Sequence, residues 1–395
     1  MSFKIYHQLG FRECWNLDSI NTHKTGEGII LSPKHMGLTN VEQLDFPREK
    51  TIFDPQFFVP SDSPGKLSEY PFYPNQSVED FSTETYKPVD VQDIAQGCLK
   101  FQVESGFEFV VIPGRPYGNN PQEYITEQEK CFITPFLNQL SSFPNHQPVL
   151  LQVLIDNHYL LNPDYFHELL DWLTSLDERI EGVYLIFQID YKTKQIEDAD
   201  YLFALLKFIN ILTEYNDLKV VIGYCNLESL VLTISGPTII TMGSYENTRR
   251  FNIENFIDTD EKRRMQPPTP RLYMSQLLQL IDYRYKDSIL EEFGNHYFDF
   301  NEYQAIMFVP DYNWHFTKPE LYKHFFLVFS NQLNQLKDMT LKARYLKVKD
   351  IITLSIENFE ILETLISFGK DSREDHLHMW LTAINRYAKY KGWKK

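Results

Sequence analysis

Residues 182–224 have the sequence GVYLIFQIDYKTKQIEDADYLFALLKFINILTEYNDLKVVIGY, in which two short apolar runs flank a longer amphipathic segment. The runs 182–189 and 218–224 are almost continuously apolar, as in strands that a parallel sheet buries on both faces. The apolar positions between them recur at helical spacing: Leu202, Leu205, Leu206, Ile209 and Leu212. The segment therefore predicts one strand–helix–strand unit.

The same alternation continues on both sides of this unit. Further strands are predicted at 28–33, 50–54, 107–113, 148–155, 237–242 and 303–310. Helices are predicted at 90–104, 123–141, 163–176, 198–214, 226–234 and 271–293. Eight strands with helices between most of them predict an α/β fold, a (β/α)8 TIM-type barrel. A doubly wound open sheet is the alternative, but no Gly-rich turn follows the first strand to support dinucleotide binding.

The expected barrel occupies residues 1–337, and a helical C-terminal extension occupies 338–395. Two long segments, 55–89 and 244–270, interrupt the alternation of strands and helices. Both follow strands, so they would lie at the C-terminal mouth of the barrel, where active-site loops are built.

Composition excludes several classes of protein. The chain has 395 residues with 38 basic and 54 acidic side chains, a net charge of −16, so its surface as a whole should repel nucleic acids and anionic membranes. No apolar run is long enough to span a membrane, and the N-terminus lacks the apolar core of a signal peptide. The four cysteines form no CxxC pair. We expect a cytoplasmic protein without a structural zinc site.

Three aspartates, Asp54, Asp156 and Asp190, follow predicted strands and are the candidate catalytic residues. Asp156 and Asp190 occupy like positions on neighbouring strands, about 5 Å apart, so one carboxyl group would have a raised pKa and act as an acid. With Asp54 they would alternatively hold a divalent cation such as Mg²⁺. Each aspartate would otherwise cap the helix that follows its strand. The sequence assigns no metal site and no cofactor.

Two segments carry candidate ligand-binding residues. Arg115 follows a predicted strand within PGRPYG (113–118), where it would hold a phosphate or carboxylate, or else be a solvent-exposed turn residue. The segment GSYENTRR (243–250) follows the seventh predicted strand, and such loops often bind phosphate in barrels. The candidates in this second segment are Ser244, Glu246, Arg249 and Arg250.

The end of the chain combines basic and aromatic residues. The residues concerned are Arg386, Tyr387, Lys389, Tyr390, Lys391, Trp393, Lys394 and Lys395. This pattern is typical of a nucleic-acid contact, or else of a solvated helix end whose basic residues suit the helix dipole.

The run KVVIGYCNLESLVLTISGPTIITMGSYENTRRF (219–251) resembles the late barrel units of tRNA-guanine transglycosylases, with Thr248-Arg249 matching the Thr-Arg of that family. Residues 317–336 and 356–362 resemble the closing helices of the family. The nucleophilic aspartate of the family would fall at about Gly243, and its cysteine-rich zinc motif is missing. The resemblance implies a barrel that has lost base exchange or moved its chemistry elsewhere, and it favours a nucleobase ligand.

Two functions follow from these observations. The first is a barrel that acts on or binds a nucleobase, nucleotide or nucleic acid at its mouth. The second is a non-catalytic scaffolding or binding subunit of a larger protein assembly, with its C-terminal helices as contact surfaces. An enzyme predicts an open mouth with clustered carboxylates, whereas a scaffold predicts a filled mouth and an exposed apolar patch on its helices.

Overall fold

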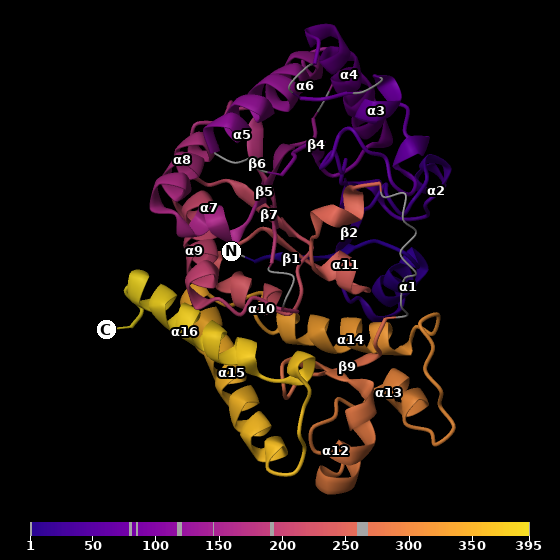
Figure 1. Cartoon of the computed structure of the whole chain (residues 1–395), viewed down its shortest axis with the longest axis vertical. Coiled ribbons are helices and arrows are strands. Elements are labelled where there is room, and N and C mark those ends of the chain that lie inside the picture. The colour runs from indigo at the N-terminus through magenta and orange to yellow at the C-terminus, as the bar shows by residue number, and fades with distance from the viewer. Residues whose placement is uncertain are drawn as a thin grey trace.

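The computed structural model describes residues 2–78, 81–83, 86–116, 121–144, 146–189, 193–258 and 268–394. Eight parallel strands form a nearly closed barrel in the order β3-β2-β1-β8-β7-β6-β5-β4 (Figure 1). They are β1 Lys4–Gln8, β2 Gly28–Leu31, β3 Thr51–Phe53, β4 Val110–Ile112, β5 Val149–Ile155, β6 Ile180–Phe187, β7 Lys219–Gly223 and β8 Ile239–Gly243. At the seam, the amide of Glu108 donates to the carbonyl of Thr51 at 2.9 Å. The predicted (β/α)8 barrel is therefore confirmed.

Helices follow the strands around the barrel. The helices up to β8 are α1 Glu13–His23, α2 Leu38–Glu42, α3 Pro74–Ser77, α4 Pro88–Ser105, α5 Pro121–Gln128, α6 Thr134–Leu140, α7 Asn157–Leu161, α8 Pro163–Thr174, α9 Ala199–Asn210 and α10 Ser229–Leu232. The barrel strands are almost entirely buried on both faces, as their apolar sequences predict for a parallel sheet covered by helices.

A long C-terminal part follows β8 and packs beneath the barrel in Figure 1. It consists of α11 Glu246–Arg249, the hairpin β9 Arg271–Met274 and β10 Gln279–Asp282, α12 Lys286–Phe293, α13 Glu302–Met307, α14 Glu320–Asn334, α15 Leu341–Glu363 and α16 Asp375–Tyr390. Helix α14 covers β1, because the rings of Phe326 and His7 lie 4.6 Å apart. Within the described residues, no helix has the length and apolarity that a membrane crossing requires.

One predicted strand is wrong, and one strand was not predicted. Residues 303–310 form α13 and the turn after it, because Asn301 caps the helix by accepting hydrogen bonds from two backbone amides. The eighth strand is instead β1, at the N-terminus. Its polar residues His7 and Gln8 interrupt the apolar pattern, yet both are fully buried.

The predicted helix 271–293 is also wrong over its first half. Residues 271–282 form the antiparallel hairpin of β9 and β10, in which Leu272, Tyr273 and Met274 are buried against α14. Only the second half of the segment, α12, is helical. The hairpin consists largely of apolar residues, and such runs fit either type of element.

Candidate functional site

The C-terminal mouth of the barrel is filled by side chains in the described part of the chain. The Phe58 ring lies 4.9 Å from that of Phe251 and 4.6 Å from that of Phe256, and all three are buried. The amino group of Lys34 lies 4.9 Å from the Phe256 ring centre. The three phenylalanines come from the segments 55–89 and 244–270, so these segments close the mouth instead of forming an open site there.

Beneath this aromatic layer, the Asp54 carboxylate is completely buried among hydrogen-bond donors. Its Oδ1 accepts from the amide nitrogen of Gln152 at 2.7 Å, and its Oδ2 accepts from the hydroxyls of Tyr184 at 3.2 Å and Tyr224 at 3.1 Å. The backbone amide of Gln56 also donates a hydrogen bond to Oδ1, at 3.2 Å. These partners lie on, or directly follow, four different strands, so Asp54 joins the strands across the barrel interior.

Burial raises the pKa of Asp54 to about 6, although its four hydrogen bonds lower it. The raised pKa is the property that an acid catalyst needs. The carboxyl group has no access to solvent in this structure. Its four hydrogen bonds hold it within the barrel interior.

Of the other two predicted catalytic residues, the structure describes only Asp156. Asp156 is the N-cap of α7, since its Oδ1 accepts from the backbone amide of Tyr159 at 3.2 Å. Burial raises the pKa of Asp156, and the Tyr159 hydrogen bond opposes this shift. Asp190 lies outside the described residues. Among the residues that the structure describes, no three His, Cys, Asp or Glu side chains are grouped to hold a metal ion.

Most of the predicted ligand-binding residues are already engaged. Arg115 pairs with Glu127 at 3.1 Å. Glu246 forms ion pairs at 2.8 Å with both Lys194 and Arg250. Ser244 is fully buried, and its hydroxyl has no hydrogen-bond partner among the described residues.

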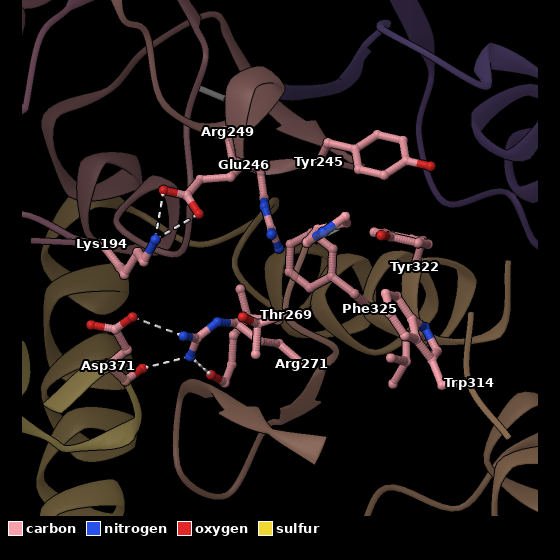
Figure 2. A pocket seen from close by; sticks show the side chains of 13 residues that line it. Lys194, Tyr245, Glu246, Arg249, Thr269, Arg271, Trp314, Tyr322, Phe325 and Asp371 are labelled. Carbon is pink, nitrogen blue, oxygen red and sulfur yellow. Dashed lines mark hydrogen bonds and ion pairs between the residues drawn. The ribbon is translucent and has the colours of Figure 1, made fainter. Parts of the chain in front are cut away.

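Arg249 is the exception. Its side chain points into a cleft of about 110 Å³ between the barrel and the C-terminal part (Figure 2). The lining residues are Lys194, Tyr245, Glu246, Arg249, Pro268, Thr269, Arg271, Leu280, Trp314, Leu321, Tyr322, Phe325 and Asp371. The cleft lies beside the filled mouth. Arg249 is the last residue of α11, the short helix that follows β8, and this position places it in the cleft.

The Arg249 guanidinium has no ion pair or hydrogen bond with another described residue, and its Nε is enclosed without a partner. It lies 5.2 Å from the ring centre of Phe325, a cation–π contact. Burial lowers the pKa of Arg249 to about 10, so it stays charged at neutral pH. A half-buried cation without an ion pair is costly, and arginine forms strong hydrogen bonds with carboxylate and phosphate groups.

Close packing fixes the position of α11, and therefore of Arg249. A Cβ atom built on Gly243 would lie 2.3 Å from the hydroxyl oxygen of Thr248, and one on Gly10 would lie 2.4 Å from its methyl carbon. Thr248 is thus wedged between the ends of β8 and β1, where only glycine leaves room. The end of β8 accordingly has no space for the side chain of a nucleophile at Gly243.

Aromatic rings form one wall of the cleft. The rings of Tyr245 and Tyr322 lie 4.8 Å apart, and Trp15 stacks on Tyr322 from behind at 5.1 Å. Trp314 completes this wall, and its Nε1 is buried without a hydrogen-bond acceptor among the described residues. Two donors of cleft-lining residues, the Nε of Arg249 and the Nε1 of Trp314, are thus enclosed without an acceptor among the described residues.

The charges in the cleft leave a local positive excess on an acidic protein. Lys194 is paired with Glu246, and Arg271 is paired with Asp371 at 2.9 Å. Both pairs appear as dashed lines in Figure 2, with Arg249 between them. Three cations against two carboxylates give a net positive site that attracts anions.

Sequence reasoning identified Arg249 but missed most of its surroundings. Lys194 follows a predicted strand closely enough to have been noticed as a mouth residue. Arg271 fell within the wrongly predicted helix. Tyr322 and Phe325 lie on α14, far from the barrel loops in sequence, and no local pattern marks them as lining a site.

The basic C-terminal segment is engaged with α9 and the turn after it. Arg386 pairs with Asp200, and Lys391 pairs with Glu214. Tyr387 is completely buried, and Lys395 lies outside the described residues. These contacts fit a packed helix end, so the segment offers few free charges to a nucleic acid.

No protein-family model and no curated protein matches the chain.

Proposed function

We propose that this protein binds the phosphate group of a small ligand in the Arg249 cleft, as a barrel whose central mouth takes no part in chemistry. The observation that carries the proposal is the half-buried Arg249 guanidinium, which faces the cleft and forms no ion pair with another described residue. A phosphate supplies several acceptor oxygens to Arg249 and Trp314 and neutralises the positive excess.

A nucleotide is the ligand class that fits the cleft best. A cleft of about 110 Å³ holds a phosphate group but not a whole nucleotide, so the sugar and base would extend along the aromatic wall. Planar bases stack on tyrosine and tryptophan rings, each stacked base contributing about 1–3 kcal/mol. The resemblance of residues 219–251 to transglycosylases makes purine nucleotides the first to test.

The experiment is isothermal titration calorimetry of the whole chain with inorganic phosphate, GMP and guanosine. We expect GMP to bind more tightly than phosphate, and guanosine to bind weakly. Arg249→Met keeps the contact with Phe325 but removes the charge, so GMP affinity should fall by about 10- to 100-fold, as expected when a charge-assisted hydrogen bond is lost.

Arg115→Met is the matched control, because this arginine is paired with Glu127 away from the cleft. It should leave the affinity for GMP unchanged. The proposal is wrong if neither phosphate nor GMP binds at millimolar concentration, or if Arg249→Met and Arg115→Met weaken binding equally.

A scaffolding role is the second candidate. The described aromatic side chains that fill the barrel mouth favour it. Anion binding in the cleft is compatible with this role.

A further inference from the structure

The Arg249 cleft continues into a small recess that amide side chains line. The recess has a volume of about 20 Å³, enough for one group the size of a water molecule. It shares six lining residues with the cleft, Arg249 among them, and adds Gln195, Asn226 and Gln279. The exposed fractions of these three residues are 3%, 5% and 2%. Amides buried beside an anion site are candidates for residues that determine its specificity.

A chain of hydrogen bonds fixes the orientation of the Gln195 amide. Its Nε2 donates to the Oε1 of Gln279 at 2.9 Å, and the Nε2 of Gln279 donates to the carbonyl oxygen of Arg373 at 2.8 Å. A backbone carbonyl only accepts, so neither amide can be reversed. The Oε1 of Gln195 therefore remains an acceptor, and it has no hydrogen-bond donor among the described residues.

The amide of Asn226 is oriented in the same way. Its Nδ2 donates to the carbonyl oxygen of Lys194 at 3.1 Å, so its Oδ1 is the free end, enclosed without a donor in the described part of the chain. The backbone amide of Asn226 donates to the Oε1 of Glu228 at 2.9 Å, which holds the turn after β7 in place. The recess is thus lined by two residues with unpaired acceptors. Because an unpaired buried acceptor is costly, the recess favours a ligand that supplies a donor.

The donor must belong to an anion, because the recess shares Arg249, Lys194 and Arg271 with the cleft. Sulfate has four acceptor oxygens and no proton at neutral pH, so amide oxygens repel it. Inorganic phosphate keeps at least one proton at the same pH and carries it as a P–OH group. A recess that holds one oxygen atom next to Arg249 matches such a group on the phosphorus itself.

We propose that the recess selects a protonated phosphate group. The P–OH of the ligand donates to the amide oxygens of Gln195 and Asn226, while its other oxygens accept from Arg249. This inference rests on the proposed function and narrows its ligand class to inorganic phosphate and to phosphate monoesters, which bind as monoanions. Phosphodiesters, including the backbone of a nucleic acid, carry no P–OH at neutral pH and are excluded.

The experiment is isothermal titration calorimetry of the whole chain with inorganic phosphate and with sulfate at about pH 7. Both anions are tetrahedral, and only phosphate carries a proton. We expect the wild type to bind phosphate at least about ten-fold more tightly than sulfate, since sulfate leaves buried acceptors unpaired. Asn226→Leu removes one acceptor at similar volume and should lower this ratio by at least about three-fold. Gln195→Met is the second variant, with the same expected effect.

The ratio of the two affinities separates selection from damage to the fold, because a distorted cleft would weaken both anions alike. Arg249→Met should weaken both and leave the ratio unchanged. The matched control is Asn358→Leu, because Asn358 is a buried asparagine of α15 whose Nδ2 donates to the carbonyl oxygen of Gln276 at 2.8 Å, outside the cleft. It should leave both affinities unchanged.

Equal binding of phosphate and sulfate by the wild type would overturn this inference and leave phosphate binding in the cleft standing. A ratio that neither Asn226→Leu nor Gln195→Met lowers would overturn it too. Failure of both anions to bind at millimolar concentration would overturn the proposed function together with this inference.

Discussion

At the scale of single residues, the protonation of Asp54 makes the stability of the folded protein depend on pH. Burial raises its pKa to about 6, so the folded protein holds this proton more tightly than the unfolded chain does. The stability that Asp54 contributes is therefore complete below about pH 4 and is lost as the pH rises to about 6. A shift of about two pKa units corresponds to about 3 kcal/mol.

Asp54→Asn tests this effect, because asparagine has the same shape without the charge. The stability of the wild type relative to Asp54→Asn should fall by about 3 kcal/mol between about pH 4 and pH 7. Urea unfolding of both proteins across this range measures the difference, in which the other titrating groups cancel. A difference that is constant with pH would show that Asp54 has an ordinary pKa and is in contact with water.

The candidate site residues show how much of the site could be predicted from the sequence. The strand ends could be located, so Asp156 and Arg249 were placed correctly as residues that follow strands. Whether an aspartate caps a helix or is buried in the barrel depends on backbone geometry and on partners up to 170 residues away, such as Tyr224 for Asp54. The difference between Arg249 and Arg250 likewise depends on Glu246, which forms an ion pair with Arg250 but not with Arg249.

At the scale of elements, seven of the eight barrel strands were predicted because each is a mainly apolar run. The missing strand, β1, contains the buried polar residues His7 and Gln8. Asn16 and Thr25 lie within hydrogen-bond distance of the His7 ring, at 3.1 and 3.0 Å. Buried polar residues with such partners break the apolar pattern without weakening the strand. Only the tertiary structure reveals the partners.

Phe58, Phe251 and Phe256 together close the mouth, and Phe256→Ala tests this packing. The substitution removes a ring that packs on Phe58 and lies over the Lys34 amino group. We expect a loss of about 3–5 kcal/mol of unfolding free energy, as for other buried phenylalanines. Urea unfolding at pH 7 measures it.

The matched control is Phe300→Ala, since this ring is 62% exposed. It should change the unfolding free energy by less than about 1 kcal/mol. An equally small loss for Phe256→Ala would mean that these three phenylalanines leave the mouth open in solution.

At the scale of the whole molecule, the cleft forms where the C-terminal part packs against the barrel. Arg249 and Lys194 come from the barrel loops, whereas Tyr322 and Phe325 come from α14 and Asp371 from the segment before α16. The sequence predicted both parts but not their contact. A contact of this kind joins residues more than 70 positions apart, and no local spacing encodes it.

The whole molecule also buries four histidines in neutral form. Burial lowers the pKa of His7 to about 3 and that of His35 and His376 to about 4, and it lowers the pKa of His324. The stability that depends on these neutral rings is present above about pH 6.5 and is lost as the pH falls below it, because the unfolded chain then binds the protons. Burial raises the pKa of Asp54 to about 6 and that of Glu228 to about 7. These two groups therefore act in the opposite direction.

The histidines should prevail, since His7, His35 and His376 each gain about one proton on unfolding at about pH 5, whereas Asp54 and Glu228 each lose one. We expect a net uptake of about one proton, which lowers the unfolding free energy by about 1.4 kcal/mol for each pH unit of acidification. Urea unfolding at several values between about pH 5 and pH 7 measures this slope. Stability that stays constant or rises toward pH 5 would show that the histidines are charged in the folded protein. Acid should therefore unfold this chain through the buried histidines of β1, α14 and α16.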